Sequence, residues 1–383
     1  MAFLPDGTMF FTEKCHGLSV RQSGGTVVKL LGMKDAKGYA SSAGDLFCEG
    51  QAGMAGVAVA VAVAVDPNFA SNRFVYVYST SSLAAPGSNR VMRLKGNDNA
   101  TAVSDRTDIV TDIPYKSRAS DHPFGGPGAH NGGASPLQPR RRLSLRDHRR
   151  HAQRRSASKP DPHRRQGSAH RPQRQGRPGQ WRASGLRLSG LHLWASQPQG
   201  ITFRPGTHQP YTAENGPGHT DEVTALVPGG NAGWDPRPNI GGRGACPDGY
   251  CGYSPNQMGA MDPKERGAFM PMTDTKTYPN AMRPAWTNDG LSQGLFTGTF
   301  LTGSQWKAWN GRMIIGFTGI GIHGTPVGNR LDVLDIKADG SSATRTTVNL
   351  PMPAARFRSL VQGPDGNLYI ATDEGAISRL TPN

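Results

Sequence analysis

Two arginines that alternate along an expected strand are the first residues whose spacing could do chemistry. Arg356 and Arg358 flank Phe357, and side chains two residues apart on a strand point to the same face of a sheet. Paired guanidinium groups can form forked, charge-assisted hydrogen bonds to a carboxylate. The spacing by itself fits such a pair of binding residues and fits equally two solvated arginines on an edge strand.

A histidine lies in the glycine-rich stretch Gly128-Ala-His-Asn-Gly-Gly133. A neutral imidazole whose pKa lies near the working pH can remove a proton from a hydroxyl group. A histidine in such a turn can also serve only to hydrogen-bond a neighbouring loop. The local sequence by itself favours that second role for His130.

The elements that would position these residues are β-hairpins. Pro5-Asp-Gly7 and Pro364-Asp-Gly366 each separate two apolar, β-rich runs, and looser copies occupy Val65-Asp-Pro-Asn-Phe69 and Ile201-Thr-Phe-Arg-Pro205. Asp-Gly between such runs is a strong hairpin signal, because glycine accepts the positive φ of a tight turn. Copies at roughly 60-residue intervals predict an all-β fold, a six-bladed β-propeller with about four strands per blade. A β-sandwich or barrel with common hairpins is the alternative.

A basic window interrupts this pattern. The chain carries a net charge of +15, yet residues 134–197 hold 16 Lys and Arg against two Asp, which leaves about +1 for the rest. The window contains no Val, Ile, Phe or Tyr, so it cannot bury enough apolar surface to fold as strands. A disordered basic linker or a nucleic-acid-binding arm is one interpretation, and binding that weakens steeply with salt would support it.

The cysteines and apolar runs give further expectations. Cys246 and Cys251 enclose turn residues, so a local disulfide is expected in an oxidising compartment, with free thiols as the alternative. No signal peptide precedes the first expected strand, and no apolar run is long enough to span a bilayer.

Several motifs, in this order, resemble the glucose/sorbosone dehydrogenase family of soluble quinoproteins that depend on pyrroloquinoline quinone (PQQ). The likeness covers most of residues 1–133 and 198–383, and the family's export signal and first strand are missing upstream of Met1. The motifs are Glu49-Gly-Gln-Ala-Gly-Met54, Gly128-Ala-His-Asn-Gly-Gly133, Asn215-Gly-Pro-Gly-His-Thr-Asp-Glu222, Gly229-Gly-Asn-Ala-Gly-Trp234 and Arg356-Phe-Arg358.

The resemblance implies roles for residues of the catalytic and cofactor sites. His130 would be the base that removes the proton from the C1 hydroxyl of the sugar, while the quinone accepts hydride. Gln51 would contact PQQ through its amide, and Arg356 and Arg358 would bind its carboxylate or quinone oxygens. Trp286 would stack on the quinone, with a place in the hydrophobic core as the alternative.

The resemblance also implies a Ca²⁺ ion that polarises the quinone. Successive backbone carbonyls of Gly216 and Pro217 would supply part of its oxygen shell. Asp221 and Glu222 match nearby acidic positions, which would stabilise this loop or bind a second Ca²⁺. A solvated acidic turn is the alternative for this pair.

A shift of the reading frame accounts for the basic window. With permitted codons, residues 147–154 read one base on as TTGDTHNG, and three further segments of the window give family-like strings in the same frame. We therefore interpret residues 134–197 as out of frame, within a single propeller domain over residues 1–383. The recovered frame has an Arg-Asn pair where this chain has Ser196 and Gln197. The family uses that arginine at the reactive quinone carbonyl, so activity of this chain should be impaired.

The resemblance thus implies a periplasmic or secreted sugar dehydrogenase that oxidises the C1 hydroxyl of aldoses or aldehyde hydrates. Its partners would be a sugar and an external electron acceptor, with no nucleic acid and no membrane span. The alternative is a non-catalytic propeller that binds carbohydrate or protein; only a quinoprotein has reason to take up quinone and Ca²⁺.

Overall fold

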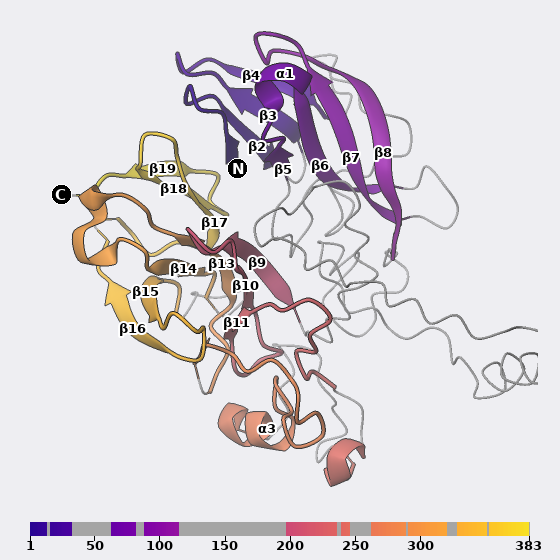
Figure 1. The fold of residues 1–383 in the computed structure, drawn as a ribbon, viewed down its shortest axis with the longest axis vertical. Coiled ribbons are helices and arrows are strands. Elements are labelled where there is room, and N and C mark those ends of the chain that lie inside the picture. Colours follow the sequence, from indigo (N-terminus) through magenta and orange to yellow (C-terminus); the bar gives the residue numbers. More distant parts are fainter. Residues whose placement is uncertain are drawn as a thin grey trace, which may run out of the picture. The chain divides into compact units, whose positions relative to one another are not determined.

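The computed structural model describes residues 1–13, 16–32, 63–81, 88–114, 197–235, 239–245, 262–288, 290–319, 328–350 and 352–382. By their contacts, these residues all belong to one compact unit. They form the antiparallel sheets of an all-β propeller (Figure 1). The fold class predicted from the hairpin pattern is therefore confirmed.

Two sheets come from the N-terminal third of the chain. The first contains β1 (Ala2–Phe3), β2 (Met9–Glu13), β3 (Gly17–Arg21) and β4 (Val27–Leu31), and the second contains β5 (Val63–Val65), β6 (Phe74–Ser81), β7 (Ser88–Gly96) and β8 (Val103–Pro114). The short helix α1 (Phe69–Asn72) links β5 to β6. The two sheets bury one hydrophobic cluster, in which Phe10 packs edge-on against Phe69.

Three sheets follow residue 197. They contain β9 (Pro198–Phe203), β10 (Pro210–Glu214), β11 (Glu222–Ala225) and β12 (Trp286–Thr287); then β13 (Leu295–Phe300), β14 (Met313–Phe317), β15 (Leu331–Ile336) and β16 (Ala343–Val348); and then β17 (Phe357–Gln362), β18 (Leu368–Thr372) and β19 (Ile377–Leu380). The helices η3 (Ile240–Gly242) and α3 (Pro263–Phe269) lie between β11 and β12, and η4 (Ser304–Trp309) lies between β13 and β14.

The predicted turns form where expected. Pro5-Asp-Gly7 joins β1 to β2 and Pro364-Asp-Gly366 joins β17 to β18, with φ of 88° at Gly7 and 77° at Gly366. These positive angles explain why glycine ends each turn. The looser copies join β5 to β6 and β9 to β10. Each copy therefore connects the first two strands of its sheet, as a blade repeat requires.

The first strands of the three later sheets, β9, β13 and β17, lie side by side. Gly200 of β9 lets the backbones approach, because a Cβ there would stand 3.0 Å from Thr297 Cα. The amide of Leu360 on β17 donates to Thr297 Oγ1 at 3.1 Å. The first and last sheets also touch, since the rings of Phe3 and Tyr369 lie 4.6 Å apart.

The part of the chain that the structure describes holds five sheets rather than the six blades predicted. Residues 115–133, and all of the window 134–197 except Gln197, lie outside the described residues. The extent of the single domain over this window stays a prediction.

Candidate active site

One edge of the third sheet gathers the residues that the sequence singles out. Strand pairing sets Pro198 beside Glu214, and Glu222 beside both Glu214 and Thr287. The start of β9, the loop 215–221 and the segment 288–294 therefore meet at this edge. Arg330, next to β15 of the fourth sheet, donates to Gln293 in this group of loops. Arg356, next to β17 of the fifth sheet, donates to Thr318, which itself donates to the carbonyl oxygen of Gly294. We therefore treat the edge as the candidate active site.

Asp221 organises this edge. Its side chain is fully buried, at 0% exposure. Its Oδ1 accepts from the amide of Gly216 at 3.1 Å and from Ser292 Oγ at 2.6 Å, and its Oδ2 accepts from Asn288 Nδ2 at 2.9 Å and from the amide of Gln293 at 2.7 Å. Burial raises the pKa of Asp221, and these hydrogen bonds oppose that shift. Asp221 stabilises the loop and is not a solvated acidic residue.

The Gly216-Pro217 step lies inside the loop that Asp221 holds. A Cβ on Gly216 would stand 1.7 Å from the carbonyl oxygen of His219 and 2.3 Å from that of Thr220, so only glycine fits. Pro217 is buried, and no donor among the described residues reaches its carbonyl oxygen. The carbonyl oxygen of Gly216 accepts from the amide of Gly218 at 2.9 Å, so the Pro217 carbonyl oxygen is the one of the two that has no donor in the described part of the chain and suits a hard cation such as Ca²⁺.

Glu222 begins β11 and is buried. Its Oε2 accepts a hydrogen bond from Thr273 Oγ1 at 2.9 Å. Within the described residues, no three His, Cys, Asp or Glu side chains gather as a metal site. The metal roles of Gly216, Pro217, Asp221 and Glu222 stay predictions.

A series of polar contacts connects this edge to the next sheet. Gln293 donates to Asp221 through its backbone and accepts from Arg330 Nη1 through its side chain. Arg330 Nε in turn donates to both oxygens of Asp332, at 3.1 and 2.9 Å. The guanidinium also lies over the ring of Phe317, 4.2 Å from its centroid. The Gly216-Pro217 loop is thus tied to β14 and β15.

Arg356 and Arg358 share one partner, as expected of side chains on one face. Arg356 Nε donates to Asp373 Oδ2 at 2.8 Å, and Arg358 donates to both oxygens of Asp373, from Nη2 at 2.7 Å and from Nε. Arg356 Nη1 also reaches the carbonyl oxygen of Thr318 at 2.9 Å. Burial alone would raise the pKa of Asp373, but the hydrogen bonds and charges of Arg358 and Arg356 outweigh it and lower that pKa.

The arginine pair retains capacity for an anion. Its side chains are 22% and 24% exposed, and a single Asp373 carboxylate serves both. Arg356 Nη2 and Arg358 Nη1 donate to no group in the described part of the chain. Two positive charges, one direct carboxylate partner and unused donors fit a ligand carboxylate.

Trp286 lies in the hydrophobic core. It is 8% exposed, and its ring meets Phe317 edge-on at 6.1 Å. This is the alternative place that the sequence left open for Trp286, and its stacking on a quinone stays a prediction.

His130 and Gln51 lie outside the described residues, as do Cys246 and Cys251. No helix in the described ranges is long and apolar enough to cross a membrane.

The structure adds residues that the sequence did not single out, namely Asn215, His219, Asn288, Ser292, Gln293, Arg330 and Asp373. His219 is wholly buried next to Pro217, and its Nε2 has no hydrogen-bond partner. Burial, with help from the charge of Arg266, lowers the pKa of His219 to about 4, so its imidazole is neutral near pH 7. Its place inside the motif Asn215–Glu222 was the one signal for it, whereas Gln293 and Arg330 have no local signal.

Comparisons with known proteins agree with the family resemblance of the sequence motifs. A family model described as Glucose / Sorbosone dehydrogenase matches residues 1–379. Aldose sugar dehydrogenase YliI of Escherichia coli (strain K12) is 23% identical over 389 residues, which cover 100% of this chain and 89% of that protein.

Solved structures share the fold at low sequence identity. The soluble aldose sugar dehydrogenase of Escherichia coli in its apo form gives a TM-score of 0.54 at 17% identity, covering 100% of this chain and 95% of that one. The PQQ-bound aldose sugar dehydrogenase of Streptomyces coelicolor gives 0.51 at 14% identity, covering 97% and 86%. Because the family model spans almost the whole sequence, this chain belongs to the glucose/sorbosone dehydrogenase family.

Proposed function

We propose that this chain is a quinoprotein sugar dehydrogenase that oxidises the C1 hydroxyl of an aldose or an aldehyde hydrate with PQQ and Ca²⁺. The observation that carries the proposal is the pair Arg356 and Arg358, half-buried around one carboxylate with donors to spare. Membership of the family supports the reaction class, and the name of the PQQ-bound relative supports the cofactor.

The residues at the edge would bind and orient the cofactor. PQQ supplies a quinone that accepts hydride, and it carries the carboxylates that Arg356 and Arg358 would bind. The carbonyl oxygens of Gly216 and Pro217 would hold Ca²⁺. Asp221 keeps that loop in place through the amides of Gly216 and Gln293. Gln51 and Trp286 remain proposed cofactor contacts.

The base belongs to the histidine of the Gly128–Gly133 motif. We assign His130 the removal of the proton from the C1 hydroxyl oxygen, because a neutral imidazole can accept it near pH 7. His130→Ala should leave quinone binding nearly intact and lower turnover by about 10²–10⁴-fold. A loss of less than about tenfold would assign the base to another group.

The chain as written should be a poor catalyst. Gln197 immediately precedes β9, and its amide oxygen accepts from Asn215 Nδ2 at 3.3 Å. Ser196 and Gln197 stand where the recovered frame has an arginine and an asparagine. Neither residue is positively charged, so they give little stabilisation to negative charge that develops on a quinone oxygen. We attribute residues 134–197 to a shifted reading frame, and we assign the protein to the periplasm or to secretion, where it would use an external electron acceptor.

The experiment is a titration with PQQ in the presence of CaCl₂, followed by reduction of an artificial dye with a panel of aldoses. Both the chain as written and a frame-corrected chain are tested. Binding of PQQ by both, with dye reduction restored by frame correction, is the expected result. Robust aldose oxidation by the unedited chain would contradict the impairment, and failure of both chains to bind PQQ would favour a non-catalytic propeller.

A further inference from the structure

A pocket lies away from the candidate active site, between η4, the end of β16 and the end of β19. Its volume is about 390 Å³, within the range of small-molecule sites. Leu380 pairs with Leu368, which pairs with Gln362 at the end of β17. Arg358 and Arg356 lie toward the other end of that strand, roughly 13 and 20 Å away at the rise of a β-strand. The pocket is therefore not part of the site described above.

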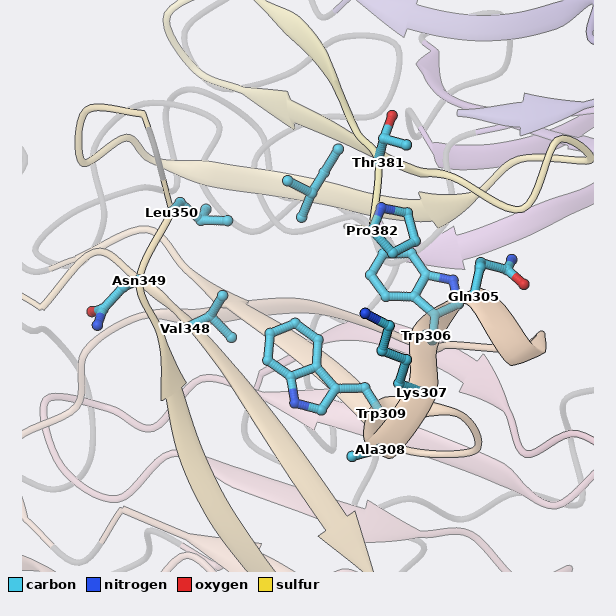
Figure 2. Close-up of a pocket in the computed structure, with 11 residues that line it drawn as sticks. Gln305, Trp306, Lys307, Ala308, Trp309, Val348, Asn349, Leu350, Thr381 and Pro382 are labelled. Carbon is cyan, nitrogen blue, oxygen red and sulfur yellow. The ribbon is translucent and has the colours of Figure 1, made fainter.

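The walls of the pocket are apolar and rigidly held. Trp306 is buried, and its Nε1 donates to the carbonyl oxygen of Gly366 at 3.0 Å. Trp309, Val348, Leu350 and Leu380 pack partly buried against the cluster behind it. Figure 2 shows the ring of Trp309 and the side chains of Val348, Leu350 and Pro382 around the opening.

One charged group faces this apolar space. In Figure 2 the ammonium of Lys307 points in between the two indoles, whereas the amides of Asn349 and Gln305 point away. Gln305 Nε2 is bound to the carbonyl oxygens of Thr302 and Gly366, at 3.3 and 3.2 Å. No carboxylate among the described residues pairs with Lys307, and none lines the pocket. Lys307 is exposed to solvent, and it is the one charged residue among the described residues that line the pocket.

The backbone at Lys307 is unusual. Its φ is 47° and its ψ is −120°, inside a short helix that kinks there. Long side chains rarely adopt positive φ, and such strained residues cluster at ligand sites. The turn is held by the amide of Asn310, which donates to the carbonyl oxygen of Lys307 at 3.1 Å. This conformation places the ammonium between the tryptophans.

We propose that this pocket binds a small amphiphilic anion, with a planar or aliphatic body against Trp309 and Leu350 and one acidic group on Lys307. Charge complementarity selects an anion, since the single charge of the lining is positive. A neutral sugar fits less well, because its hydroxyls would face aliphatic side chains while the two amides point outward.

Anilinonaphthalene sulfonate is a suitable probe because it joins an aromatic body to one negative charge, and phenylnaphthylamine is its uncharged counterpart. We expect saturable fluorescence enhancement with the sulfonate. Lys307→Gln should weaken that binding by about tenfold or more without changing the binding of phenylnaphthylamine. Trp309→Ala should weaken the binding of both probes.

Two further variants keep the test decisive. Lys307→Gly removes the charge while suiting the positive φ, so it should fold and lose the sulfonate as Lys307→Gln does. Lys337→Gln, an exposed lysine in the β15–β16 turn, is the matched control and should bind both probes normally. Sulfonate binding unchanged by Lys307→Gln, Lys307→Gly and Trp309→Ala would overturn the proposal. Competition by neutral aldoses would overturn it in favour of a sugar subsite.

Discussion

The Asp221 loop and the Arg356–Arg358 pair are each built around one carboxylate. They differ in whether hydrogen-bonding groups around that carboxylate remain available to a ligand. Asp221 is fully buried, and both of its oxygens accept from groups of its own loop and of residues 288–293. Asp373 lies between two half-buried guanidinium groups that keep unused donors. Both oxygens of the Asp221 carboxylate are used by the protein, whereas the arginine pair still offers hydrogen bonds to a ligand.

This difference distinguishes a carboxylate that supports the fold from a pair of arginines that can bind a ligand. A buried carboxylate whose oxygens are used by the protein holds backbone in place, and removing it leaves several donors without acceptors. A partly exposed pair of arginines with excess positive charge can take a further anion at little structural cost. The two regions should therefore respond differently to mutation.

The largest expected effect on stability comes from Asp221→Ala. The change removes the acceptor of Gly216, Asn288, Ser292 and Gln293, so unfolding in urea should show a loss of about 3–5 kcal/mol. Asp98→Asn is the control, because Asp98 has a 92% exposed side chain, and it should leave the midpoint unchanged. If chelation of Ca²⁺ reduced the stability of the parent to that of the variant, Asp221 would act through a metal instead.

Gly216→Ala should have the next largest effect. A Cβ 1.7 Å from the carbonyl oxygen of His219 forces the loop to move, at a cost of about 3 kcal/mol. Affinity for Ca²⁺, measured by calorimetry, should fall with it, because the carbonyls of Gly216 and Pro217 move together. Gly24→Ala meets no atom within 4 Å and is the matched control. Equal stability of the two variants would show that the loop adapts to a Cβ at Gly216 without cost. The contrast between the Asp221 loop and the arginine pair would then be wrong.

Arg358→Ala should weaken quinone binding while sparing the fold. Loss of a charge-assisted partner for a carboxylate costs about 2 kcal/mol of binding free energy in a titration of the frame-corrected chain. Arg379→Ala serves as the control, since its side chain is 61% exposed on β19. Unchanged affinity in Arg358→Ala would remove the arginine pair from the cofactor site.

The smallest effect is a pH dependence at Asp373. Its pKa is lowered from the ordinary value of 3.8, so its contribution to stability is present above that value and is lost as the pH falls through the lower folded pKa. Acid titration of the melting temperature should therefore show a modest drop below about pH 4, and Asp373→Asn should reduce that drop. A drop of the same size in the variant would assign it to other carboxylates.

Sequence alone was sufficient where the determining contacts are local. The Asp-Gly turns form hairpins because Gly7 and Gly366 accept positive φ, and the all-β fold follows from their recurrence. Alternation along a strand predicts that Arg356 and Arg358 point to one face, and both donate to Asp373 even though the register of β17 shifts at Arg358. The order of the motifs was sufficient to identify the family, because a motif is recognised from its residue types and not from its tertiary contacts.

Only the tertiary structure decided what surrounds those residues. Asp221 and Glu222 look alike in sequence, yet segment 288–293, almost 70 residues along the chain, saturates Asp221, while Glu222 bonds to Thr273. Trp286 suits a core or a stacking site equally well by its type, and its packing on Phe317 places it in the core. Burial and hydrogen-bond partners depend on contacts between distant parts of the chain, and residue spacing reports only the direction in which a side chain leaves the backbone.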